Sequence, residues 1–105
     1  MFVYALVDPL TREIKYVGRS VDPGARLMSH MSEPLGKRRA KWIRSVKRRR
    51  LRPRLIILNV CATSAEAAEM ESRMIHEYRA TVTNDLMVNR TTLSKVSTLT
   101  GNYYR

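Results

Sequence analysis

The alternation of apolar runs and turn signals predicts three β-strands. Residues 2–7 form a short apolar run, and residues 13–18 resume it after a turn at 8–12 that contains a proline. Two such runs joined by a short loop are typical of an antiparallel hairpin. Residues 54–60, which follow Pro53, are rich in leucine and isoleucine and predict a buried strand.

The hairpin places two tyrosines in relation to each other. If Asp8 and Arg12 flank the turn, Tyr4 lies opposite Tyr16. Directly opposed residues project from the same face of a sheet, so the two phenols would stand side by side. Such a pair can also serve only as part of the core.

A first helix is predicted over residues 23–31. Asp22 suits the N-cap, and a proline follows at the first helical position. Arg26 and His30 are four residues apart and share one stripe of this helix. Each alone is typical of ordinary surface, but two donors that follow a glycine-containing loop favour an anion site. The expected buried side consists of Leu27, Met28 and Met31.

A second helix is predicted over residues 37–49, after a loop at 32–36. Its narrow apolar side consists of Ala40, Trp42, Ile43 and Val46. We interpret Trp42 as a core anchor rather than a base-stacking platform, because tryptophan near aliphatic residues is usually buried.

A third helix, over residues 63–78, carries the most informative residue. Thr63 can cap it, with Glu66 three residues on to complete a capping box. Its apolar face consists of Ala67, Ala68, Met74, Ile75 and Tyr78. Glu71 falls in the middle of that face, where an uncompensated carboxylate costs several kcal/mol. Its partner can be an arginine or a metal ion.

The rest of the chain is polar apart from a short return to apolar residues. Residues 81–85 are a polar connection, and residues 86–88 are apolar and lead to Asn89. Residues 90–105 read as a tail with one helical turn near 93–98. We therefore expect one domain at 1–89 and a polar tail at 90–105.

The positive charge is concentrated in one segment. The chain has 20 Lys and Arg against 9 Asp and Glu, and residues 37–54 hold 11 of the basic residues with no acid among them. Like charges at this density repel one another, so a polyanion is the natural partner. The charge alone does not separate DNA from RNA, or a nuclease from a passive binder.

Composition excludes several classes of protein. At 105 residues the chain is long enough for one domain. A single cysteine, Cys61, allows no internal disulfide and most simply ends a core strand, and no Cys/His pattern indicates zinc. No apolar run approaches the roughly 20 residues of a membrane span, and no signal-peptide pattern opens the chain. We expect an intracellular, cytoplasmic protein with no membrane partner.

The order of short motifs resembles the GIY-YIG endonuclease family. The Gly-Ile-Tyr motif corresponds to Phe2-Val3-Tyr4, and the Tyr-Ile-Gly motif corresponds to Tyr16-Val17-Gly18. Further matching positions follow in order along the chain: Arg26, His30, Lys41-Trp42-Ile43, Leu51-Arg52-Pro53, Glu71 and Asn89. Phe2 and Val3 depart from the motif, and the extra DNA-binding domain that many members carry is not evident, which bears on target specificity.

The resemblance implies an α+β fold with a small three-stranded antiparallel sheet flanked by about three helices. It implies a metal-dependent endonuclease that nicks DNA or cuts both strands. Glu71 would bind the metal, and Arg26 would hold the scissile phosphate. Tyr4, Tyr16 and His30 would surround the attacking water and leaving oxygen, and Asn89 would help to fix the site.

The residues agree with a single-metal site. Mg²⁺ typically takes one or two carboxylates plus phosphate oxygens, and only Glu71 lies on the inner face of its helix. We expect one Mg²⁺, with Mn²⁺ able to substitute. The predicted DNA contacts are Lys37, Arg38, Arg39, Lys41, Arg44, Lys47, Arg48, Arg49 and Arg50. A homodimer or a separate specificity protein would supply target recognition, and small members of the family suggest a phage or mobile-element origin.

The identity of the general base stays open. A phenol titrates near pH 10 and an imidazole near 6.5, so His30 is the simpler acceptor, while the resemblance favours Tyr4. We interpret Gly18 as letting the backbone turn away behind Tyr16. Arg19 and Ser20 are expected in the adjoining loop, within reach of phosphate.

Two other functions compete. A catalytically inactive nucleic-acid-binding module of the same fold would explain the basic segment equally well. It would not explain why all six candidate site residues are present together. A basic ribosomal-type or RNA-packaging protein fits the composition but predicts no carboxylate on the inner face of a helix.

Overall fold

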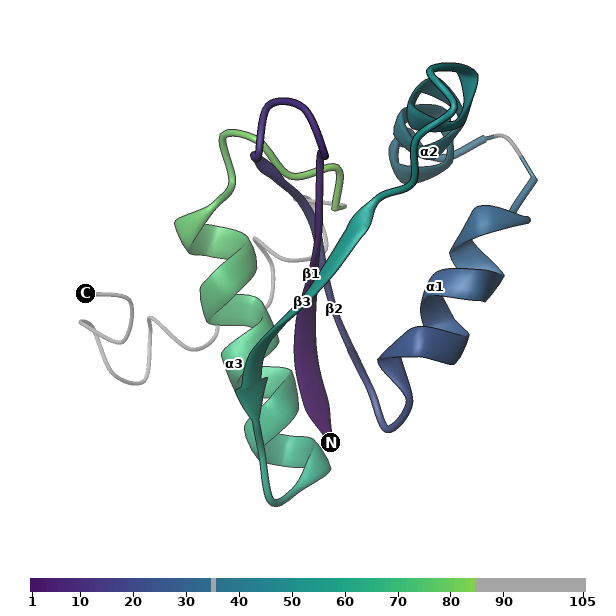
Figure 1. Ribbon diagram of the computed structural model, residues 1–105. Coiled ribbons are helices and arrows are strands. Elements are labelled where there is room, and N and C mark those ends of the chain that lie inside the picture. The colour runs from purple at the N-terminus through teal and green to yellow at the C-terminus, as the bar shows by residue number, and fades with distance from the viewer. Residues whose placement is uncertain (35, 85–105) are drawn as a thin grey trace.

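The computed structural model describes residues 1–34 and 36–84, which form one antiparallel sheet and three helices (Figure 1). The strands are β1 (Phe2–Val7), β2 (Ile14–Ser20) and β3 (Arg54–Val60), and the helices are α1 (Pro23–Met31), α2 (Arg38–Arg48) and α3 (Ser64–Glu77). The predicted α+β fold is confirmed. Asn89, the apolar return and the tail lie outside the described residues, so the domain boundary at residue 89 stays a prediction.

The sheet separates two cores. Its strand order is β2-β1-β3, so β1 is the central strand. In Figure 1, α3 lies on one side of the sheet, and α1 and α2 lie on the other. Val3 and Val17 pack with Ala67 and Ile75 of α3 in one core. The other core consists of Tyr4, Leu6, Tyr16, Trp42, Ile43 and Val46.

The register of the hairpin differs from the predicted one. Tyr4 pairs with Gly18, and Tyr16 pairs with Leu6, so the direct opposition of the two tyrosines was wrong. At the turn, the N–H of Asp8 donates to the carbonyl of Glu13, one residue beyond Arg12, and the pairing shifts by one more residue between Leu6 and Val7. An offset of two residues keeps the side chains on one face. The centroids of the Tyr4 and Tyr16 rings are 6.2 Å apart.

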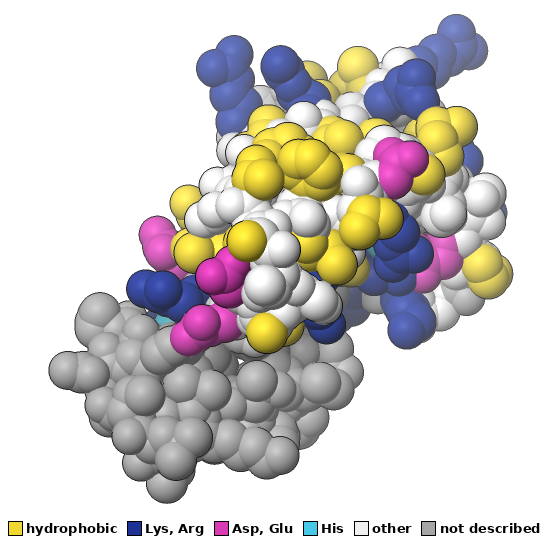
Figure 2. All heavy atoms as spheres, turned by 90° about the horizontal axis from the view of Figure 1, so that it is seen from below, with side chains coloured by type: hydrophobic (Ala, Val, Ile, Leu, Met, Phe, Trp, Pro, Cys, Tyr) yellow, Lys and Arg dark blue, Asp and Glu magenta, His cyan; other side chains and the backbone are white. Residues whose placement is uncertain are grey.

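Strand β3 lies at an edge of the sheet, so the prediction of a buried strand was wrong. It pairs with β1 alone, and Ile56, Ile57 and Val60 are exposed by 40%, 47% and 66%. A run of β-branched and leucine residues indicates a strand but does not say how many neighbours it has. Figure 2 shows hydrophobic side chains gathered on one face of the molecule, with Lys and Arg side chains projecting beyond them.

Helices α1 and α3 begin where the sequence predicts, but the side chain of Glu66 bonds a different backbone N–H from the one expected in a capping box. The side chain of Asp22 accepts from the backbone N–H of Ala25, and that of Thr63 accepts from Glu66. Glu66 in turn accepts from the N–H of Ala62, one residue before the cap. Met28 is 58% exposed, so its predicted place on the buried side of α1 was wrong.

Asp8 ties the hairpin turn to α2. Its carboxylate accepts from the N–H groups of Leu10 and Thr11, from Trp42 Nε1 at 3.0 Å and from Arg49 Nη2 at 3.1 Å. Burial favours the protonated acid, but these hydrogen bonds outweigh it and hold the pKa of Asp8 well below its usual range. Trp42 is confirmed as a core anchor.

Candidate active site

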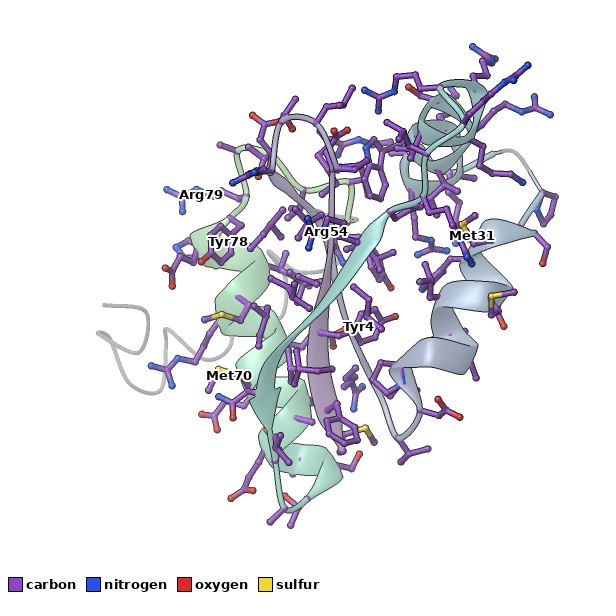
Figure 3. All side chains as sticks on the ribbon, viewed as in Figure 1. Tyr4, Met31, Arg54, Met70, Tyr78 and Arg79 are labelled. Atoms are coloured by element: carbon purple, nitrogen blue, oxygen red, sulfur yellow. The ribbon has the colours of Figure 1, made fainter. Side chains whose placement is uncertain are left out.

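The site is built around a buried contact between β1 and α1. Oη of Tyr4 lies 3.0 Å from Nε2 of His30, and the two residues are 0% and 3% exposed. Figure 3 shows Tyr4 projecting from the sheet toward α1. His30 reaches this position because Asp22 and Pro23 start α1 just after β2, which leads the helix back over the sheet.

Gly18 makes room for the Tyr4 phenol. A Cβ atom at Gly18 would stand 2.6 Å from Oη of Tyr4 and 2.9 Å from the ring of Tyr16. Gly18 lies within β2 as the direct partner of Tyr4, so the expected turn of the backbone behind Tyr16 does not occur there. The glycine is needed for space rather than for an unusual backbone conformation.

The rings of Tyr16 and His30 complete the cluster. Their centroids are 5.0 Å apart in an edge-to-face arrangement. The guanidinium of Arg39 lies over the Tyr16 ring, 4.8 Å from its centroid. The side chain of Arg39 is 16% exposed and pairs with Glu33, and its predicted contact with DNA stays a prediction.

Sequence reasoning missed Glu33, which lies just after α1. Its carboxylate accepts two hydrogen bonds from Arg39, one of them from Nε at 2.9 Å. Its Oε1 also lies 3.5 Å from Nδ1 of His30. The i, i+3 spacing of His30 and Glu33 was a usable signal, but a carboxylate in a predicted loop reads as solvent-exposed.

Burial sets the protonation of the cluster. It raises the pKa of Tyr4 to about 12, helped by the neighbouring Tyr16 and opposed by Arg26 and Arg39. It lowers the pKa of His30, together with Arg39 and Arg26 and against Glu33. The phenol and the imidazole are therefore both neutral at pH 7. Because the charge of Arg26 acts to lower the pKa of Tyr4, the predicted phosphate ligand lies close to the same cluster.

Glu71 lies on the other side of β2. Its Oε1 is 3.1 Å from Nε of Arg19, and the side chains of Glu71 and Arg19 are 22% and 39% exposed. Burial raises the pKa of Glu71, and Arg19 opposes that rise. Glu71 therefore has an arginine as its partner, which is one of the two partners that the sequence allowed. Arg19 and Ser20 belong to β2 and not to the expected loop.

The predicted site residues fall into two groups. Tyr4, Tyr16, Arg26 and His30 come together on the side of α1. Glu71 joins Arg19 on the side of α3, and among the described residues no hydrogen bond or ion pair links its carboxylate to the tyrosine cluster. The two groups meet at consecutive residues of β2, because Gly18 faces Tyr4 and Arg19 faces Glu71.

The outer edge of β2 is covered as far as Val17. Oδ1 of Asn84 accepts from the Val17 N–H at 3.0 Å, and Nδ2 donates to the Val17 carbonyl at 2.8 Å. Thr83 similarly bonds the carbonyl of Lys15. A side-chain amide carries both a donor and an acceptor, so Asn84 substitutes for a neighbouring strand. The covering was not predicted from the polar composition of 81–85.

The donor set fits a metal that takes most of its ligands from water and substrate. Among the residues described, no three His, Cys, Asp or Glu side chains are grouped as metal ligands. Glu71 offers a single carboxylate. One carboxylate suits Mg²⁺, which keeps several waters and uses phosphate oxygens, and does not suit Zn²⁺.

The basic segment is partly engaged in structural contacts. Arg49 pairs with Asp8, Arg38 donates to the Val82 carbonyl, and Lys47 donates to the Met31 carbonyl. Lys41, Arg44 and Arg48 are exposed on α2. Their predicted contacts with DNA stay predictions. No helix in the described part of the chain is both long and apolar enough to cross a membrane.

Comparison with known proteins gives one match. The sequence pattern of the GIY-YIG catalytic domain matches residues 1–85, which is most of the chain. No curated protein and no solved structure matches the chain.

Proposed function

The chain belongs to the GIY-YIG family of nuclease domains, and on that premise we propose that it is a divalent-metal-dependent endonuclease that hydrolyses phosphodiester bonds in DNA. One observation carries the proposal. Consecutive residues of β2 contact the two halves of the candidate site, Gly18 against Tyr4 and Arg19 against Glu71. A phosphate at the exposed end of β2 would therefore lie within reach of both halves.

Each residue of this cluster is proposed to have a separate role in hydrolysis. Arg26 is exposed at the rim and offers a planar guanidinium to the phosphate, whose charge grows in the transition state. The hydrogen-bonded Tyr4–His30 pair is the proposed acceptor for the proton of the attacking water. Tyr16 packs against the rings of both residues. Asn89 is proposed to help to fix the site.

Glu71 is the proposed ligand of the metal. An Mg²⁺ ion, or Mn²⁺ in its place, would supply positive charge against the phosphoryl oxygens when bound. The chain contributes a partly buried carboxylate whose present counter-ion, Arg19, must share it. We expect one ion per site, since Glu71 is the one acid proposed as a ligand.

The exposed basic residues of α2 are proposed to hold the DNA backbone. Lys41, Arg44 and Arg48 project from the helix on the side away from its apolar face. Phosphate contacts of this kind position a duplex without reading its sequence. Target choice would come from a second copy of the chain or from a separate specificity protein.

The Arg19–Glu71 ion pair also supports a second candidate, a catalytically inactive DNA-binding module. The carboxylate has a partner without any metal. In that case the basic segment would still bind DNA, and the tyrosine cluster would serve only the core.

Supercoiled plasmid separates the two candidates. The protein is incubated with plasmid and Mg²⁺ or Mn²⁺, beside EDTA, the variant Glu71→Gln and the variant Glu69→Gln. Glu69 is exposed on the same helix and controls for the loss of one charge. We expect nicked or linear product that disappears with EDTA and with Glu71→Gln and persists with Glu69→Gln. Plasmid that is retarded on a gel but never cut would support the binding module.

A further inference from the structure

We propose that Glu33, anchored by Arg39, holds the His30 imidazole in the tautomer that leaves Nε2 free to accept the phenol proton of Tyr4. The inference rests on the nuclease function proposed above and deepens it. It makes Glu33 a positioning residue, because it acts on Tyr4 only through His30. In this proposal Tyr4 takes the proton of the water, and His30 takes the phenol proton of Tyr4.

The geometry sets the direction of the relay. Oε1 of Glu33 lies 3.5 Å from Nδ1 of His30, while Nε2, on the far side of the ring, lies 3.0 Å from Oη of Tyr4. A carboxylate accepts hydrogen bonds and cannot donate them, so the proton of a neutral imidazole is favoured on Nδ1. Nε2 then carries the lone pair, and the phenol must donate to it.

The position of Glu33 is fixed from two sides. Its backbone N–H donates to the carbonyl of His30 at 3.3 Å, which holds the start of the loop against the end of α1. Its carboxylate takes two hydrogen bonds from Arg39 of α2. Arg39 also stacks over Tyr16 of β2. A carboxylate held by a rigid fork loses little freedom when it orients a second group.

The relay balances as a proton transfer coupled to attack on phosphorus. The water oxygen forms a bond to phosphorus as the bond to the leaving oxygen breaks. Tyr4 is buried in the free protein, so this step requires that bound DNA bring the attacking water against its Oη. One water proton then passes to Oη of Tyr4 while the phenol proton passes to Nε2 of His30. The imidazolium that results faces Glu33, whose negative charge stabilises it. Tyr4 remains a neutral phenol at the end, so its high pKa is no obstacle.

The groups that face His30 predict how the loss of Glu33 would act. Tyr4 and Tyr16 face it from the sheet, Arg26 from α1 and Arg39 from α2. Glu33 is the acid that faces His30 among the residues that the structure describes, and it raises the pKa of His30 against burial and the two guanidinium groups. Without it, the imidazole would accept a proton less readily and would not be biased toward Nδ1–H.

Two-bond ¹H–¹⁵N correlation spectra of the full chain test the tautomer without any need for cleavage. The chain has two histidines, so His76 serves as an internal reference. We expect Nδ1–H for His30 in the wild-type protein, a mixed or Nε2–H form in Glu33→Leu, and partial retention in Glu33→Gln, whose amide oxygen can still accept. The matched control Glu69→Leu should leave the His30 signals unchanged.

Single-turnover cleavage supplies the second readout. We expect Glu33→Leu to lose roughly 10- to 100-fold in rate at unchanged DNA affinity, as for a lost proton-transfer partner. A wild-type spectrum with Nε2–H would overturn the proposal, whether or not the variants fold. So would an unchanged tautomer in Glu33→Leu. A wild-type protein that shows Nδ1–H but cuts no DNA would support the positioning and contradict the nuclease.

Discussion

Gly18 and Tyr4 face each other across the β1–β2 pair so closely that a methyl group on Gly18 would stand 2.6 Å from the phenol oxygen. Tyr4 is the last residue of the first motif, and Gly18 is the last residue of the second. The space that the Tyr4 phenol occupies therefore requires glycine at position 18. The same strand carries Arg19 to the opposite side, where it meets Glu71. The consecutive residues Gly18 and Arg19 of β2 therefore contact the two groups of candidate site residues.

Replacing Gly18 tests that relationship. In Gly18→Ala the added Cβ must push the Tyr4 ring away from His30. We expect cleavage to fall at least 10-fold and the free energy of unfolding to fall by about 1–3 kcal/mol, as for an overpacked core. Gly24→Ala is the control, because its Cβ meets nothing closer than 3.6 Å and lies in α1. A Gly18→Ala protein with wild-type melting temperature and rate would contradict this packing.

Asp8 predicts how stability depends on pH. Its folded pKa lies below the value of about 3.9 in the unfolded chain, so its contribution is present above pH 4 and is lost as pH falls further. We expect Asp8→Asn to lower the free energy of unfolding by about 1–3 kcal/mol at pH 7 and by much less at pH 2.

Chemical denaturation at several pH values measures this difference. Asp22→Asn is the matched control, since asparagine caps a helix as well as aspartate does. A loss of stability in Asp8→Asn that is as large at pH 2 as at pH 7 would show that the charge of Asp8 is not responsible.

If Glu71 binds the metal as proposed, Arg19 competes with that metal for the carboxylate. Removal of its guanidinium in Arg19→Met leaves the carboxylate without its counter-ion, so we expect Mn²⁺ to bind several-fold more tightly, as measured by electron paramagnetic resonance. Arg44→Met makes the same change of net charge on α2 and should leave the affinity nearly unaltered. Weaker Mn²⁺ binding by Arg19→Met would mean that Arg19 helps to build the metal site.

The exposed face of α2 predicts a salt dependence. Each phosphate that is neutralised contributes a slope of about 0.9 to the fall of log K with log salt on duplex DNA. The double variant Arg44→Gln/Arg48→Gln should reduce that slope by about 2. Arg73→Gln/Arg79→Gln removes two exposed charges at α3 and just beyond it, and should change the slope little. Equal effects of the two pairs would remove α2 from the interface.

Local signals in the sequence predicted the elements well. Asp22-Pro23 and Thr63 start their helices where capping chemistry requires, and the apolar side of α2 is buried as expected. The end of α2 had no such signal. Arg50 adopts a positive φ of 62° there, a conformation in which glycine is usual, and the N–H of Leu51 bonds back to Val46.

Contacts between different elements were harder to predict from the sequence. The pairing of Tyr4 with Gly18 depends on how the turn closes, and a shift of two residues leaves the apolar pattern unchanged. The exposure of Ile57 depends on which strand lies at the edge. The contact of Glu33 with Arg39 joins a loop to a helix, and nothing in the spacing singles out Arg39 among the arginines of the basic segment.

The most direct test of the nuclease is the single-turnover rate on a short labelled duplex with protein in excess and DNA binding measured alongside. For Glu71→Gln we expect the dissociation constant for DNA to stay within a factor of three of the wild type. We expect the cleavage rate to fall roughly 100-fold or more, because the carboxylate proposed to hold the metal is lost. A Glu71→Gln protein that cuts bound DNA as fast as the wild type would contradict the account.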